Sequence, residues 1–104
     1  IDTAPYSGGL TTCEALAMGV PVVTVPGTTM ASRHSFGHVT NAGYPQWSFE
    51  SEEDLLDESQ ELVGDILEQR LDKLMIRDQV LASHLCDVER YVNDICALFE
   101  SLTR

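Results

Sequence analysis

The feature that most constrains the fold is a short β-branched run with glycine or proline at each end. Val20-Pro21-Val22-Val23-Thr24-Val25 stands between Gly19 and Pro26-Gly27, and such a run favours a buried strand of a parallel sheet. Pro21 lies at its beginning, where a strand tolerates proline. The segment from Thr11 to Met18 before it contains five good helix formers, residues 14–18, and stops at Gly19. The pattern predicts a helix leading into a strand.

The residues at the start of the chain extend this pattern. Ile1 to Tyr6 read as the end of a strand entering a turn. Strand, glycine turn, helix and strand in that order predict a right-handed parallel crossover, the unit of doubly wound α/β sheets. The chain starts at Ile1 without a methionine, so we expect a fragment of a longer protein, with one domain or part of one in its 104 residues.

Two further segments follow the predicted strand. Residues 31–42 predict a second helix that ends at Asn41-Ala42-Gly43, and residues 44–49 predict a loop or a short edge strand. A long helix is then predicted from Ser51, because a capping residue followed by three acids suits a helix amino terminus. Its apolar stripe has helical spacing and comprises Leu55, Leu56, Leu62, Val63, Ile66, Leu67, Leu71, Leu74 and Met75.

The apolar stripe falters at residues 82–84 and then restarts, with Asp87 as the predicted cap of a last helix. The second stripe comprises Val88, Tyr91, Val92, Ile95, Leu98, Phe99 and Leu102. We therefore expect residues 1–50 to form a strand-turn-helix-strand unit and residues 51–104 to form helices that pack on it.

Charge and cysteine content exclude several classes of function. The net charge is -11, of which residues 1–49 carry -1 and residues 50–104 carry -10. Acidity of this kind repels phosphate backbones and anionic lipids, so we expect neither nucleic-acid nor membrane partners. Cys13, Cys86 and Cys96 are odd in number and lack the spacing of a zinc or disulfide framework. A reducing cytoplasm is the expected compartment.

The candidate site is the glycine turn before the first helix, Ser7-Gly8-Gly9-Leu10-Thr11-Thr12-Cys13-Glu14. Glycines there let backbone amides approach an anion, and the first N–H groups of the helix can hold a phosphate. Thr11 and Thr12 would add hydroxyl donors, Ser7 could cap the helix or join the site, and Glu14 could accept hydrogen bonds from a ribose. On spacing alone, a plain turn with Glu14 complementing the helix dipole explains the pattern equally well.

A family resemblance favours the first interpretation. Residues 2–9, 11–16 and 18–23 together resemble one continuous segment of bacterial O-linked N-acetylglucosamine transferases and SPINDLY-like proteins. Ala31-Ser32-Arg33, Ile76-Arg77 and residues 83–87 resemble the later part of the same segment. The resemblance implies the carboxy-terminal part of the catalytic region of such an enzyme.

The resemblance also implies a fold and an activity. The fold would be α/β, part of one Rossmann-like half of a two-domain (GT-B type) glycosyltransferase, with parallel strands followed by two or three helices. The full enzyme would be inverting and metal-independent. It would transfer a sugar from a nucleotide donor to a protein hydroxyl, and we expect the donor to be UDP-N-acetylglucosamine. The protein acceptor would bind through the remainder of the enzyme.

The resemblance places the donor site on the glycine turn. Donor-binding residues would be Ser7, Gly8, Gly9, Thr11, Thr12 and Glu14. Thr11 matches a threonine that contacts the donor diphosphate, and Glu14 matches an acid that binds the ribose. Leu10 and Gly9 depart from the family pattern, which usually has a small hydroxylated residue and a longer polar residue there. No complete catalytic site lies in these residues, so we expect this chain alone to be inactive.

Other candidates carry weaker signals. His34 and His38 have helical spacing that could hold a metal, but no further ligand stands near them, and we expect neither a metal nor another cofactor. Arg33 could serve the donor anion or pair with a carboxylate such as Asp2. Cys13 could have a depressed thiol pKa or be buried.

Two alternative functions remain open at this point. A sugar-nucleotide epimerase of the same architecture would also place a glycine pair and an acid at this helix. A non-catalytic helical module would instead use the two apolar stripes to bind a partner. In either case we expect the isolated chain to self-associate, because unpaired strand edges and apolar faces seek partners.

Overall fold

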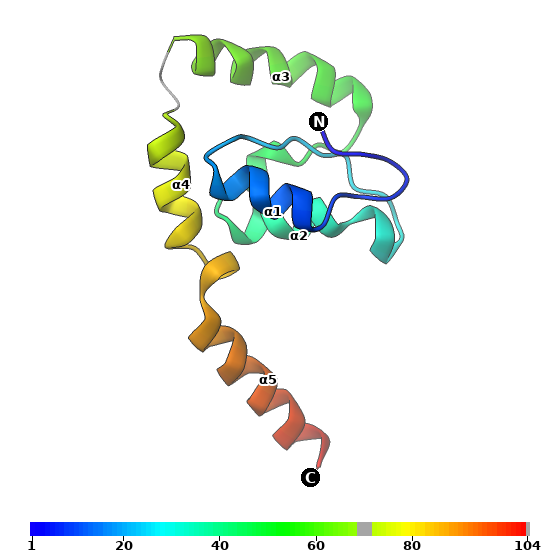
Figure 1. Cartoon of the computed structure of the whole chain (residues 1–104). Helices are drawn as coiled ribbons and strands as arrows, with labels where there is room; N and C mark the ends of the chain where they lie inside the picture. Colours follow the sequence, from blue (N-terminus) through cyan, green and yellow to red (C-terminus); the bar gives the residue numbers. More distant parts are fainter. Residues whose placement is uncertain (69–71, 104) are drawn as a thin grey trace.

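The computed structural model describes residues 1–68 and 72–103, and helices dominate it (Figure 1). The α-helices are α1 (Leu10–Ala17), α2 (His34–Asn41), α3 (Glu52–Leu67), α4 (Lys73–Leu81) and α5 (Val88–Leu102). Single 3-10 turns are η1 (Met30–Ser32), η2 (Pro45–Trp47) and η3 (His84–Cys86). In the first view α1 and α2 form the centre of the body, α3 lies across its top and α4 along one side.

The predicted α/β fold class is wrong, because the described residues contain no strand. The β-branched run makes one parallel bridge, between Thr24 and Ser48. That bridge comprises the bonds from Thr24 N–H to the Trp47 carbonyl (3.0 Å) and from Phe49 N–H to the Thr24 carbonyl (2.9 Å). The proline after Val25 has no N–H to donate to the next carbonyl, and Trp47 donates its N–H to the Tyr44 carbonyl within η2, so the bridge extends in neither direction. Val22 and Val23 are nevertheless buried, so the run packs in the core without forming a strand.

Side-chain caps set the starts of the later helices. Ser51 Oγ accepts a hydrogen bond from Asp54 N–H (3.1 Å), and Asp87 accepts one from Arg90 N–H (3.0 Å), which confirms both predicted caps. Asp72 accepts a bond from Leu74 N–H (2.9 Å) and begins α4, so the single long helix predicted from Ser51 is two separate helices. Leu71 of the predicted stripe lies outside the described residues.

The end of α1 fixes the position of α4. Gly19 has a positive φ of 75°, a conformation that favours glycine after a helix. A Cβ atom on Gly19 would lie 2.1 Å from the Lys73 carbonyl oxygen. The glycine therefore stops α1 as predicted and also lets the first turn of α4 approach its backbone.

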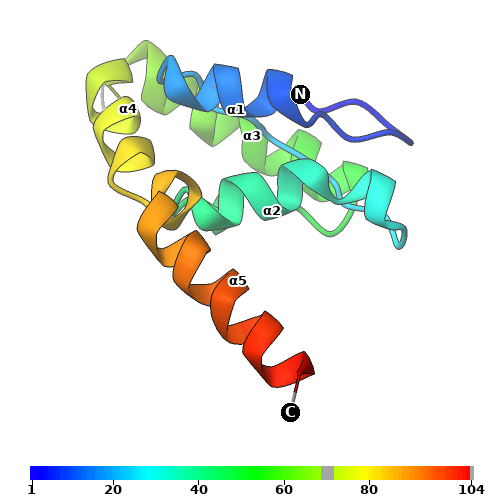
Figure 2. The same ribbon diagram turned by 60° about the horizontal axis from the view of Figure 1, so that its bottom comes forward.

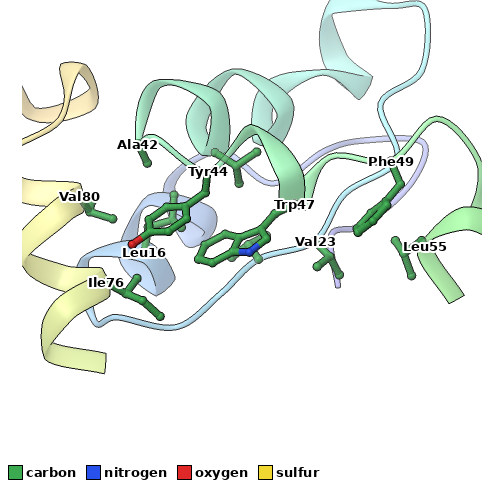
Figure 3. Packing of buried hydrophobic residues seen from close by; sticks show 11 residues of the cluster. Leu16, Val23, Ala42, Tyr44, Trp47, Phe49, Leu55, Ile76 and Val80 are labelled. Atoms are coloured by element: carbon green, nitrogen blue, oxygen red, sulfur yellow. The ribbon is translucent and has the colours of Figure 1, made fainter. Parts of the chain in front are cut away.

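The core lies between α1, α2, α4 and the segment around η2 (Figure 3). Leu16, Val39, Ile76 and Val80 are fully buried there. Tyr44 and Trp47 add a stacked pair with ring centroids 4.0 Å apart and planes within 3° of parallel. The figure shows the two rings between Ile76 and Val80 on one side and Val23 on the other. The first half of the chain thus supplies most of the core.

The later helices differ in how much of their surface is covered. In α4, Ile76 and Val80 are buried, whereas α3 buries Leu55 alone. Helix α5 buries none of its residues and projects away from the body in both views (Figures 1 and 2). In the described part of the chain, no helix combines the length and apolarity needed to cross a membrane.

Candidate functional site

The glycine turn is held in place by one carboxylate, that of Asp2. One of its oxygens accepts hydrogen bonds from the hydroxyls of Ser7 (2.7 Å) and Thr24 (2.8 Å). The other accepts bonds from the N–H groups of Gly8 (2.8 Å) and Thr3 (2.9 Å). The backbone N–H of Asp2 also donates to the Val23 carbonyl (2.9 Å). Asp2 therefore ties the start of the chain, the glycine turn and the β-branched run together.

The same contacts decide the ionisation of Asp2. Partial burial tends to raise its pKa, but hydrogen bonds from Gly8 N–H and from the hydroxyls of Ser7, Thr24 and Ser35 outweigh this and lower it. The carboxylate is therefore charged at neutral pH. Because its pKa is lower in the folded chain, its stabilising contribution is present at neutral pH and is lost as the pH falls through the folded pKa.

Ser7 and Thr12 lie in a buried hydroxyl network rather than at the surface. Ser7 is 1% exposed, and its Oγ accepts a hydrogen bond from Ser35 N–H (2.8 Å) in the first turn of α2. Thr12 is 5% exposed, and its hydroxyl lies 2.8 Å from the Ser35 hydroxyl, which donates to the Gly8 carbonyl (3.1 Å). Ser7 thus caps α2, not α1, and Thr12 joins the two helices.

The two glycines of the turn have different surroundings. A Cβ atom on Gly8 would lie 2.6 Å from the Thr12 hydroxyl oxygen and 3.3 Å from Asp2, so the network requires glycine there. A Cβ atom on Gly9 would have no atom within 4 Å. Gly8 therefore serves the packing of the turn, whereas Gly9 leaves open space at the start of α1.

The amino terminus of α1 has free hydrogen-bond donors. Gly9 occupies the N-cap position, where no side chain caps the helix. Within residues 1–68 and 72–103, the N–H groups of Leu10, Thr11 and Thr12 have no hydrogen-bond partner. Such amides, with the positive end of the helix dipole, form an anion-binding arrangement. The helix that carries them, Leu10–Ala17, is eight residues long.

Two predicted site residues remain accessible beside these amides. Thr11 and Glu14 are both exposed and stand three residues apart, so they share one face of α1. Leu10, also exposed, precedes them at the first helical position, where it offers no side-chain donor. The structure therefore gathers Gly9, Thr11 and Glu14 at the surface and leaves Ser7, Gly8 and Thr12 beneath as support.

The other candidates of the sequence take structural positions. Arg33 donates to the Gly27 carbonyl (2.8 Å) and lies 4.5 Å over the Phe36 ring, so it does not form the suggested pair with Asp2. Burial, with the nearby Cys86 thiol, raises the pKa of Cys13, which excludes the depressed-pKa alternative. No group of three or more metal-ligating side chains occurs in the part of the chain that the structure describes.

His34 and His38 differ in their surroundings. The His34 ring lies 5.8 Å from that of Tyr6. Burial, helped by His34, lowers the pKa of His38, so His38 favours the neutral form. These positions give both rings a packing role.

Asp2, Thr24 and Ser35 are the members of the network that the sequence patterns did not reveal. Asp2 and Glu14 are the only acids among the first 49 residues, and this rarity is the one sequence signal that points to Asp2. The donors come from positions 5, 6 and 22 residues away. Only the fold brings them together.

Comparison with known proteins defines the class of protein. No family model matches the chain. Among solved structures, it superposes on a mutant O-GlcNAc transferase of Thermobaculum terrenum with a TM-score of 0.70 and 32% sequence identity. The match covers 90% of this chain and 19% of that one. The chain is therefore similar to one part of a glycosyltransferase.

Curated relatives define the family more closely. The chain is 29% identical over 104 residues to the tomato (Solanum lycopersicum) protein described as a probable UDP-N-acetylglucosamine–peptide N-acetylglucosaminyltransferase SPINDLY. It is 32% identical over 87 residues to the Arabidopsis thaliana protein of the same description. The first match covers 100% of this chain and 11% of the relative, and the second covers 84% and 10%. The resemblance to the SPINDLY and O-GlcNAc transferase family is confirmed, and this chain spans about a tenth of its curated relatives' length.

Proposed function

We propose that this chain is the donor-binding part of a glycosyltransferase that transfers a sugar, N-acetylglucosamine, from a UDP donor to a protein hydroxyl. The observation that carries the proposal is the uncapped start of α1, with free N–H groups at Leu10, Thr11 and Thr12 beside exposed Thr11 and Glu14. The curated relatives are described as probable transferases of N-acetylglucosamine from UDP-N-acetylglucosamine to peptides. A nucleotide sugar has the two groups that this surface suits, a diphosphate and a ribose diol.

The diphosphate would lie against the free amides of α1. Its negative charge is favoured by the helix dipole, and Thr11 Oγ adds a hydroxyl donor. Open space at Gly9 lets the phosphate oxygens approach the backbone. When the bond between the sugar and the diphosphate breaks, charge builds up on the leaving diphosphate, and donors already in position stabilise it.

Glu14 would hold the ribose. It lies one turn further along the same face as Thr11, so its carboxylate can accept hydrogen bonds from two ribose hydroxyls while the phosphates stay at the helix end. The acceptor protein and the groups that activate its hydroxyl would be supplied by the rest of the enzyme. The share of this chain is donor placement and leaving-group stabilisation.

Steady-state kinetics of the full-length enzyme test this assignment. Thr11→Ala and Glu14→Ala are each expected to raise the KM for the donor by about tenfold, because each removes one hydrogen-bonding partner of a charged or polar ligand. Thr28→Ala and Glu100→Ala are matched controls, since both residues are exposed and remote from α1 in sequence. Donor KM and kcat that stay unchanged in both site variants would show that the donor binds elsewhere.

A further inference from the structure

Ser35, in the first turn of α2, contacts the glycine turn at three points, and its side chain is fully buried. Its N–H donates to Ser7 Oγ (2.8 Å), its hydroxyl donates to the Gly8 carbonyl (3.1 Å), and its Oγ lies 2.8 Å from the Thr12 hydroxyl. Helices α1 and α2 lie side by side (Figures 1 and 2), and these bonds join α2 to the start of α1. Ser35 therefore lies next to the turn whose amides are proposed to bind the diphosphate.

The hydroxyl protons of this network can all be placed, with one acceptor each. Ser7 gives its proton to Asp2, so its Oγ is free to accept the N–H of Ser35. Ser35 gives its proton to the Gly8 carbonyl, so its oxygen can accept the proton of Thr12. Among the residues that the structure describes, no other group donates to the Gly8 carbonyl. The direction of this carbonyl therefore depends on the Ser35 hydroxyl.

The bond to Ser35 also sets the direction of the Gly9 N–H. Gly8 and Gly9 are joined by a trans peptide bond, in which the carbonyl of the first residue and the N–H of the second point in opposite directions. Because the Gly8 carbonyl points at Ser35, the Gly9 N–H points away from it. Within the described ranges this N–H has no hydrogen-bond partner, and a Cβ atom on Gly9 would meet no atom within 4 Å. The Gly9 N–H is therefore a further free donor at the start of α1.

The neighbouring peptides are held by other groups. Asp2 accepts the Gly8 N–H (2.8 Å), which belongs to the preceding peptide. Cys13 N–H donates to the Gly9 carbonyl (3.2 Å), which belongs to the following peptide. The peptide between Gly8 and Gly9 has glycine on both sides, and glycine lacks the Cβ atom that restricts backbone rotation. Ser35 is therefore the anchor that this peptide needs.

We propose that Ser35 is a positioning residue of the donor site, whose hydroxyl holds the Gly8–Gly9 peptide so that the Gly9 N–H faces the diphosphate. This inference rests on the proposed function, which places the diphosphate at the start of α1. When the bond between the sugar and the diphosphate breaks, the leaving diphosphate gains negative charge, and an N–H that already points at it stabilises the transition state more than the ground state. Loss of the Ser35 hydroxyl is therefore expected to lower kcat more than it raises the KM for the sugar donor.

Steady-state kinetics of the full-length enzyme with UDP-N-acetylglucosamine test the proposal. Ser35→Ala is expected to lower kcat about tenfold and to change the donor KM by less than about threefold. It keeps the backbone N–H that bonds Ser7, so the start of α2 is retained. Ser35→Cys carries a thiol, a weaker hydrogen-bond donor, and is expected to give an intermediate kcat, which keeps the test decisive if Ser35→Ala folds poorly. A kcat that stays unchanged in the folded variants would overturn the proposal.

Two further measurements separate positioning from loss of stability. Val80 is buried in α4 and takes no part in the network, so Val80→Ala is expected to be less stable but to keep the parent kcat and KM while it is folded. Calorimetric titration of the full-length enzyme compares UDP with uridine, which lacks the diphosphate. Ser35→Ala is expected to weaken UDP binding about fivefold and to leave uridine binding unchanged. Equal weakening of both ligands would assign Ser35 to the general structure of the site and contradict the inference.

Thr11→Ala and Glu14→Ala distinguish failure of this inference from failure of the proposed function. If these two variants raise the donor KM while Ser35→Ala leaves kcat unchanged, the donor site is correct and the role of Ser35 is wrong. If none of the three variants changes kcat or KM, the donor binds elsewhere and both proposals are wrong.

Discussion

The glycine turn and helix α5 have opposite relations to the rest of the chain. Around the turn, one carboxylate and four buried hydroxyls fix the backbone through hydrogen bonds shorter than 3.2 Å, and residues far apart in sequence take part. Helix α5 has local capping and a well-formed stripe but no buried residue. The turn is thus rigid enough to hold a small ligand in one geometry, whereas the apolar stripe of α5 stays exposed within the described residues.

The largest loss of stability is expected from a substitution of Gly19, the glycine that ends α1. Gly19→Ala is expected to destabilise the fold by about 3 kcal/mol or more, because alanine disfavours the positive φ and its Cβ would overlap the Lys73 carbonyl. Gly37→Ala is the control, since a Cβ there meets no atom within 4 Å, and it is expected to be neutral or slightly stabilising in α2. Urea unfolding measures both, and equal stabilities would contradict the close packing of α1 on α4.

The next largest loss of stability is expected when the hydrogen-bond network of Asp2 is broken. Asp2→Asn is expected to cost about 2–3 kcal/mol, because an amide cannot accept all the bonds that reach the carboxylate and leaves buried Ser7 and Thr24 poorly partnered. Unfolding followed by circular dichroism measures the loss. A variant as stable as the parent would show that the network does not hold the turn.

The lowered pKa of Asp2 also predicts how the stability of the chain depends on pH. Since hydrogen bonds lower the pKa of Asp2, the parent chain is expected to lose stability as the pH falls below about 4, the ordinary range of an aspartate. Asp2→Asn is expected to have a flatter dependence on pH in that range. Urea unfolding at a series of acidic pH values compares the two slopes, and parallel curves would contradict the lowered pKa.

A matched pair of valines compares the body with α5 directly. Val80 is 1% exposed in α4, and Val92 is 49% exposed in α5. Val80→Ala is expected to cost about 2 kcal/mol through lost burial and an internal cavity. Val92→Ala is expected to change the stability of the dilute chain by less than about 0.5 kcal/mol. Thermal unfolding at low protein concentration distinguishes them, and a large cost at Val92 would mean that the body does cover α5.

Local signals predicted the helices well. The stop at Gly19, the caps at Ser51 and Asp87 and the stripe of α5 all appear in the structure, because each depends on residues within one or two turns of helix. The break before α4 was missed although Asp72 is a good capping residue, since the apolar stripe continues across it. Periodicity alone does not show where one helix ends and the next begins on the same face.

The fold class could not be predicted in the same way. The run after Gly19 has the composition of a strand, but a strand exists only through its neighbours, and here the neighbouring segments supply a single bridge. At the candidate site, the sequence placed Ser7, Thr11 and Thr12 together among the predicted donor-binding residues. Only tertiary contacts show that Thr11 faces outward while the other two hydroxyls support the network.

The smallest effect on stability is expected from substitutions of the proposed donor-binding residues. Thr11→Ala and Glu14→Ala are expected to change the free energy of unfolding by less than about 0.5 kcal/mol, because both side chains are exposed. Their effect should fall on ligand binding instead. Urea unfolding measures the first quantity, and a large loss would assign these residues to the fold.

Titration of the ¹⁵N-labelled chain with UDP, followed by amide chemical shifts, tests the donor site most directly. The account predicts concentration-dependent shifts centred on Gly9 to Glu14, weakened in Thr11→Ala and Glu14→Ala and retained in Thr28→Ala. The amides of α5 should not shift. Shifts that spread evenly over the chain, or that gather away from α1 while Gly9 to Glu14 stay unchanged, would contradict a donor site at the start of α1.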